Sequence, residues 1–184
     1  MDEKNEAPKA QLSDCTCHMA LGAVMVLLHD RIWPLGMLGF VLIAISAGKL
    51  RDSRAGFDRV QLFAGLCAAC KLMTMAVSGI AVGVWIGSML LPVLVLLLIH
   101  ALRCAFGAQT AGENRISLAA LIAQLLSTAL ALASNILALG VVGGMQITVY
   151  VAAHMASVVL EWLAIVLIVI FLLVKRRKTK EETV

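Results

Sequence analysis

Long apolar segments limit this chain to few folds. About 20 consecutive apolar residues suffice for a helix to cross a hydrocarbon core about 30 Å thick. The chain is 61% hydrophobic and only 14% charged, whereas a soluble domain carries about 25% charged residues. We therefore predict an all-α fold, a polytopic transmembrane helical bundle. The apolar segments are residues 18–28, 35–47, 60–82, 93–106, 117–139 and 147–174.

Turn-forming residues divide these segments into pairs. Asp30, Arg31 and Pro34 separate the first two segments and favour a turn there. Glycine-containing uncharged stretches at 83–91 and 140–146 separate the later ones. The sequence thus predicts six segments arranged as three hairpins. A five-span alternative stays open, in which the N-terminus lies outside the cell.

Basic residues predict the orientation in the membrane. Lys and Arg gather in residues 49–59, 103–116 and 175–180, and the turns at 83–91 and 140–146 have none. Loops rich in Lys and Arg stay on the cytoplasmic side. We therefore expect a multi-pass protein of the cell membrane with a cytoplasmic C-terminus. This pattern also accounts for the net charge of +4, so nucleic acid is not an expected partner.

Composition divides the chain into three parts. Residues 1–14 are polar and of mixed charge, and they predict a cytoplasmic leader outside the membrane core. Residues 15–174 predict a single transmembrane helical domain. Residues 175–184 begin with Lys175 and three further basic residues, and they predict a basic cytoplasmic tail.

Two charged residues interrupt apolar segments near their centres. Lys71 lies within 60–82 and Glu161 lies within 147–174. A charged side chain at the bilayer centre costs roughly 2.5–3.5 kcal/mol on insertion scales, and such residues commonly pair with each other and mark functional sites. We expect Lys71 and Glu161 to face each other near the middle of the membrane.

Further polar residues recur at helical spacing and predict a shared polar interior. Residues spaced by three, four or seven positions lie on one face of a helix. A row of small residues, which lets another helix approach closely, accompanies the second set. The three sets are Cys67, Lys71, Thr74 and Ser78; Gln124, Thr128 and Asn135; and His154, Ser157 and Glu161; the row is Ala119, Ala123, Ser127 and Ala131.

The cysteines suggest a weaker, alternative chemistry. Cys67 and Cys70 have the spacing of thiol oxidoreductases and zinc sites. Cys15, Cys17 and Cys104 would lie toward the same cytoplasmic side as Cys67, and these four are the candidate ligands of a soft metal. Small apolar cysteines also pack inside helices without any chemistry, and no cofactor is expected.

Three functions are compatible with these patterns. The first is a transporter or transport component that binds a small solute at the polar site in mid-membrane. The second is a non-catalytic assembly or sensor subunit with a membrane-protein partner or a second copy of itself. The third is a thiol or metal redox protein. No catalytic motif is present in the sequence, which therefore does not favour an enzyme and assigns no catalytic residue.

Two resemblances add to this reading. Residues 29–50, HDRIWPLGMLGFVLIAISAGKL, resemble uncharacterised small multi-span membrane proteins of Gram-positive anaerobes, except that Leu35 stands where that pattern has Asp. That resemblance implies no activity. In size and topology alone, the chain is similar to the substrate-binding subunits of energy-coupling-factor transporters.

Overall fold

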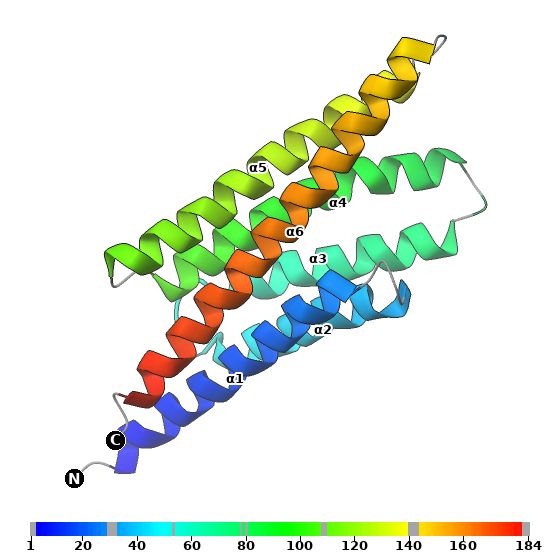
Figure 1. Ribbon diagram of the computed structural model, residues 1–184. Coiled ribbons are helices and arrows are strands. Elements are labelled where there is room, and N and C mark those ends of the chain that lie inside the picture. The colour runs from blue at the N-terminus through cyan, green and yellow to red at the C-terminus, as the bar shows by residue number, and fades with distance from the viewer. Residues whose placement is uncertain are drawn as a thin grey trace.

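The computed structural model describes residues 3–28, 33–52, 54–77, 79, 81–107, 110 to 139 and 144–181. It is all-helical, as predicted, and no strand lies within those residues. The six helices (Figure 1) are α1 (Glu3–Leu27), α2 (Trp33–Leu50), α3 (Phe57–Ala76), α4 (Ala81–Phe106), α5 (Ala111–Leu139) and α6 (Gly144–Glu181).

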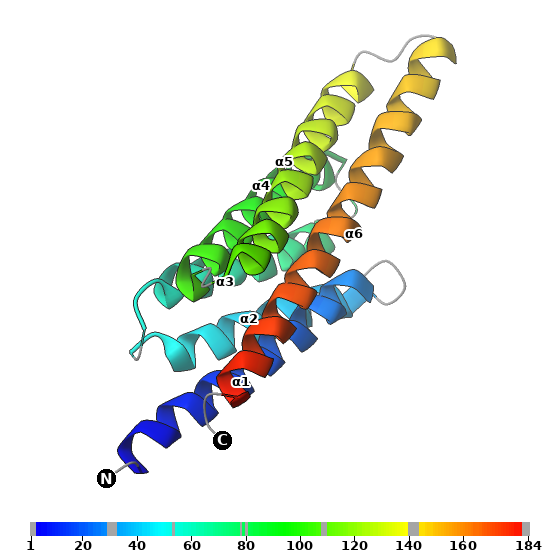
Figure 2. The same cartoon turned by 60° about the vertical axis from the view of Figure 1, so that its left-hand side comes forward.

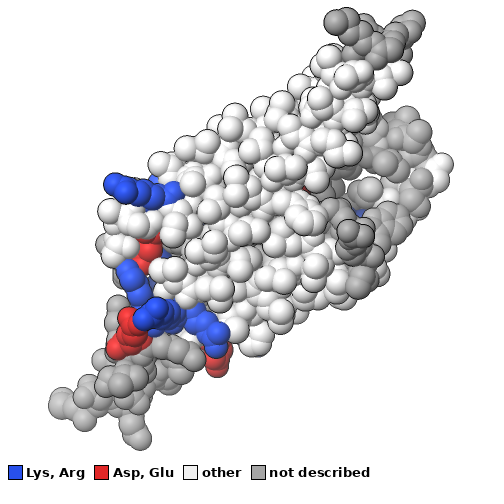
Figure 3. Space-filling view, in the orientation of Figure 1, with Lys and Arg blue, Asp and Glu red and all other residues white. Residues whose placement is uncertain are grey.

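The helices form a closed ring. Each helix packs against the next one along the chain, and α6 packs against α1. Two views show that α1 begins and α6 ends at the same end of the molecule (Figures 1 and 2). The charged residues gather at this end, which we call the basic end, and most of the same face is uncharged (Figure 3). The paired helices α5 and α6 extend farthest in the opposite direction (Figures 1 and 2).

Three helices are long and apolar enough to cross a membrane. They contain the candidate spans Trp85–Phe106, Ala111–Ala138 and Ile147–Thr179. The apolar part of α2, Pro34–Leu50, is shorter. By length and composition, then, the described parts of α4, α5 and α6 could each cross a membrane, as in a membrane protein.

Several helices extend beyond their predicted boundaries. The stretch 83–91, predicted as a turn, is helical because α4 begins at Ala81 and contains Pro92 in its interior. Helix α6 continues through Lys175 to Glu181 and includes most of the predicted tail. Helix α1 begins at Glu3, within the predicted leader, and Leu12 is buried. These extensions are stabilised by contacts with other helices, which hydropathy does not reveal.

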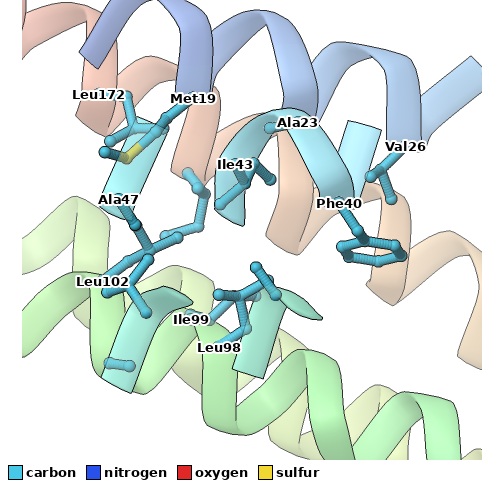
Figure 4. Packing of buried hydrophobic residues seen from close by; sticks show 14 of the residues in the cluster. Met19, Ala23, Val26, Phe40, Ile43, Ala47, Leu98, Ile99, Leu102 and Leu172 are labelled. Carbon is cyan, nitrogen blue, oxygen red and sulfur yellow. The ribbon is translucent and has the colours of Figure 1, made fainter. Parts of the chain in front are cut away.

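Apolar side chains from four helices fill the ring on its basic side. Met19 of α1, Phe40 of α2, Leu98 of α4 and Leu172 of α6 surround a small cavity of about 30 Å³ (Figure 4). A cavity of this size could hold a water molecule, but water needs two or more polar partners. The walls are entirely apolar, so we expect the cavity to stay dry.

Two glycines bring the first two helices into backbone contact. A Cβ atom added to Gly22 would lie 2.7 Å from the Gly39 carbonyl oxygen, and a Cβ added to Gly39 would collide with the Gly22 carbonyl oxygen. Backbone atoms cannot move aside as a flexible side chain can. Small residues at such crossings let membrane helices approach closely, so this pair sets the distance between α1 and α2.

We predict that Gly39→Ala destabilises the protein by about 1–3 kcal/mol, the usual cost of overpacking. The matched control is Gly65→Ala on α3, where an added Cβ meets no atom within 4 Å. Because alanine favours helix over glycine, that variant should gain about 0.5–1 kcal/mol. Unfolding midpoints in detergent micelles measure both changes. Equal midpoints for the two variants would contradict the close crossing.

A buried ion cluster joins α5 to α6 at the basic end. The Glu113 carboxylate is 1% exposed and contacts Lys175 Nζ at 2.9 Å and Lys178 Nζ at 2.7 Å. Lys175 is also buried and lies 5.9 Å from the centre of the Phe171 ring. Since Glu113 is in the first turn of α5, its charge also interacts favourably with that helix terminus.

We predict that Glu113→Gln destabilises the protein by about 3–5 kcal/mol, because it leaves buried Lys175 without its counter-charge. The control is Glu181→Gln, which removes the exposed pair between Arg177 and Glu181. Such exposed pairs one helical turn apart contribute only about 0.3–0.5 kcal/mol. Thermal unfolding of both variants in the same detergent gives the comparison, and similar losses would show that the Glu113 cluster is no stronger than a surface pair.

Candidate functional site

The two predicted charges lie within about one helical turn of each other along the ring. Helix α3 runs away from the basic end, and Lys71 is about 21 Å along it from Phe57 at 1.5 Å per residue. Helix α6 returns to the basic end, and Glu161 is about 15 Å before Phe171, which lies at the level of Phe57 because both rings pack on Phe106. Both side chains are half-buried. We call this level, with the polar groups described next, the polar layer.

A buried thiol links the two charges. The Cys67 side chain is fully buried and interacts electrostatically with both Lys71 and Glu161. Lys71 lies one helical turn from Cys67 on α3, whereas Glu161 reaches it from α6. Lys71 and Glu161 each take part in interactions within the structure. The fold therefore brings both charges to the neighbourhood of one buried atom.

The next polar residue of α3 lies against α4. Thr74 Oγ1 donates a hydrogen bond to the Cys70 carbonyl at 2.8 Å. Its side chain fills the space beside Gly87, where an added Cβ would collide with Thr74 Oγ1. Thr74 thus packs the α3–α4 contact. Ser78, also predicted for the site, lies outside the described residues.

Two side chains of α5 bind one backbone carbonyl of α4. Gln124 Nε2 donates to the Pro92 carbonyl oxygen at 3.4 Å, and the Thr128 hydroxyl shares its proton between the Gln124 carbonyl at 2.8 Å and the Pro92 carbonyl at 3.2 Å. Both residues are buried. The Gln124 Oε1 atom is buried too and makes no hydrogen bond within the described part of the chain. Gln124 is about 20 Å along α5 from Ala111, so this oxygen belongs to the polar layer.

Asn135 lies elsewhere, about 10 Å farther along α5 than Thr128. Its Oδ1 accepts a hydrogen bond from Ser88 Oγ at 3.0 Å, and its carbonyl accepts one from Trp85 Nε1 at 3.4 Å. Asn135 Nδ2 donates to the Ala131 carbonyl at 2.9 Å. Asn135 therefore joins α5 to the first part of α4, away from the two charges.

The predicted residues of α6 separate. Ser157 is buried, and its carbonyl accepts a hydrogen bond from Ser127 Oγ of α5 at 2.9 Å. His154 is exposed and stacks on Tyr150, with ring centres 6.0 Å apart. Ser157 and Glu161 are therefore covered by neighbouring helices at least in part, whereas His154 lies on the exposed surface, outside the polar layer.

The predicted row of small residues lies at the α5–α6 contact in part. Ala123, Ser127 and Ala131 are buried, but Ala119 is exposed, and the fully buried residue at that level is Ala120. The hydrogen bond from Ser127 to a backbone carbonyl of α6 shows how closely the helices approach. A row of residues four positions apart drifts by about 40° at each step around a helix of 3.6 residues per turn, so Ala119 lies off the contact and Ala120 takes its place.

The cysteines are free thiols in different environments. Cys15 and Cys67 are buried, Cys17 and Cys70 are half-buried, and Cys104 is exposed with its Sγ 3.7 Å from His100 Nε2. Within the described residues, no group of three or more His, Cys, Asp and Glu side chains could hold a metal ion. The candidate ligands Cys15, Cys17, Cys67 and Cys104 thus do not converge there.

Two contributions to these contacts were not predicted from the sequence. One is the Pro92 carbonyl, a backbone group that leaves no side-chain signal. The other is Glu113, which occurs in a stretch predicted as a basic loop. Its partners Lys175 and Lys178 occur about 60 residues later. Sequence spacing reveals ion pairs within one helix, where Glu and Lys lie four residues apart, but it does not reveal pairs between distant helices.

No protein-family model matches the chain, and no curated protein or solved structure is significantly similar to it.

Proposed function

We propose that all six helices lie in the membrane and that the basic end faces the cytoplasm. The closed ring supports this, because α1, α2 and α3 pack alongside the helices long enough to span. With α1 beginning and α6 ending at the basic end, six crossings would place both termini on one side of the membrane. The Lys and Arg residues at that end then obey the positive-inside rule.

The exposed cysteine tests this topology. We predict that a membrane-impermeant maleimide labels Cys104 only after the membrane is permeabilised, because Cys104 lies near the end of α4 at the basic end. A reporter fused after Val184 should likewise be active only in the cytoplasm. Labelling of Cys104 in intact cells would reverse the orientation. A second maleimide experiment on a cysteine introduced at Gln11 separates six spans from five, since only the five-span arrangement exposes that position outside.

We further propose that the protein is a transporter, or a component of one, that binds a small polar solute at the polar layer. The observation that carries this proposal is the meeting of opposite charges from α3 and α6 around the buried Cys67 thiol. Ionisable residues inside a membrane are costly and commonly mark substrate pathways. The buried Gln124 Oε1 supplies an acceptor at the same level.

The chemistry of the layer indicates the kind of solute. The Lys71 ammonium suits a carboxylate or another anionic group. The Glu161 carboxylate suits an ammonium or a hydroxyl, and Gln124 Oε1 accepts one hydrogen bond. A small zwitterion satisfies all three groups and restores any charge contacts it displaces. Such binding leaves no charge unpaired in the low-dielectric interior.

A second candidate is a non-catalytic membrane subunit whose polar residues only fix helix packing. The hydrogen bonds of Thr128 and Ser127 to carbonyls of neighbouring helices favour it. Such bonds commonly contribute below about 1 kcal/mol each in membranes. In that case the charges would set the positions of α3 and α6, and the protein would be isolated with a stoichiometric partner.

A double-mutant cycle decides between these functions. We predict that Lys71→Met and Glu161→Gln each destabilise the protein and that the double variant loses less than the sum, by about 0.5–3 kcal/mol. A panel of zwitterionic and anionic solutes, including amino acids and small carboxylic acids, is then tested by thermal shift in detergent. At least one should stabilise the wild type and fail to stabilise the double variant.

The control for this cycle is Leu72→Met, which changes an exposed neighbour of Lys71 and should keep both stability and solute binding. A loss of stability in the double variant equal to the sum of the two single losses would show that the charges do not couple. A solute that stabilises the wild type and the double variant equally would place its site elsewhere. Coupled charges without any stabilising solute, together with a co-purifying partner, would favour the second candidate.

A further inference from the structure

A groove opens at the basic end between the start of α3 and the end of α4. Its volume is about 860 Å³, within the range of about 300–1,000 Å³ typical of ligand pockets. Its lining includes the charged Arg51 and Arg59, the apolar Phe63, Leu97 and Ala101, and the polar His100 and Cys104 of α4. It is separate from the polar layer, and the inference below depends only on membrane location and not on the proposed solute.

The loop before α3 is held against α4 by a glycine. Gly56 has φ of 97°, in the left-handed region that favours glycine. A Cβ added to it would lie 3.3 Å from Ala105 Cα on α4. This close approach fixes one wall of the groove and places Arg51 of the loop beside the last turns of α4.

The groove changes from charged to apolar with depth. Arg59 is in the first turn of α3, and Phe63 follows one turn deeper. On α4, Leu97 lies about 14 Å before the helix end at Phe106. Because α4 contains a candidate span that ends at Phe106, the arginines lie at headgroup level and Leu97 at the level of acyl chains.

The arginines are available to an anionic ligand. Both side chains are exposed, and no ion pair among the described residues includes either of them. A guanidinium group matches phosphate with two parallel hydrogen bonds. Asp58 also lines the groove, which leaves one net positive charge from the three residues and adds an acceptor for a hydroxyl group.

We propose that this groove binds one anionic phospholipid, with its phosphate at Arg51 and Arg59 and an acyl chain along Phe63 and Leu97. A glycerol headgroup fits best, because its hydroxyls can donate to Asp58. The apolar side accepts a chain without selecting it, since lipid tails are as apolar as leucine. Selection between lipids therefore comes from the headgroup, through the two arginines and Asp58.

The test uses the full-length protein in mixed micelles of phosphatidylglycerol and phosphatidylcholine, with bound lipids counted by native mass spectrometry. The wild type should retain one phosphatidylglycerol in preference to phosphatidylcholine. Each basic residue near a membrane surface contributes about 1 kcal/mol to attraction of anionic lipid, so Arg51→Gln/Arg59→Gln should reduce the preference roughly tenfold or more.

The matched control is Arg54→Gln/Arg115→Gln, which removes the same charge from exposed residues that do not line the groove. It should keep most of the preference. Equal losses in both double variants would show attraction by general surface charge and overturn the proposal. Displacement of the lipid by millimolar glycerol 3-phosphate would also overturn it, because the site would then bind a soluble anion. Unfolding midpoints verify that both double variants remain folded.

Discussion

The packing of the last two helices depends on the ion pairs of the buried Glu113 carboxylate. It is held between Lys175 and Lys178, and a buried carboxylate without a partner would cost several kcal/mol. This requirement fixes the end of α6 against the start of α5. Because α6 also packs against α1, the position of α6 determines whether the ring of helices closes.

Buried polar groups also need partners at the polar layer, where the groups are amides, hydroxyls and backbone carbonyls. Gln124 and Thr128 share the Pro92 carbonyl, and Ser127 reaches a carbonyl of α6. These polar side chains contact backbone carbonyls of neighbouring helices, as expected where water is absent.

Hydropathy predicted the number of helices and the pairing of the first two, because long apolar runs and a proline-containing break are local features. It did not predict helix ends. The stretch 83–91 forms part of α4, where Ser88 and Trp85 bond to Asn135, a contact visible only after folding. Helical spacing brought Lys71, Gln124 and Glu161 to one level, but it also included His154, which is exposed. Helical spacing identifies which residues share a face of a helix, but it does not show which part of that face is covered by neighbouring helices.

The basic end and the polar layer surround their charges differently. At the basic end, charges meet water and neighbouring cations, so Glu113 can stay ionised while Arg51 and Arg59 remain exposed. At the polar layer, about 20 Å deeper, Lys71 and Glu161 are half-buried, and a buried charge is costly unless partners lie nearby. A solute bound there would have to replace those partners as it enters, which favours a molecule that carries both charges itself over a single ion.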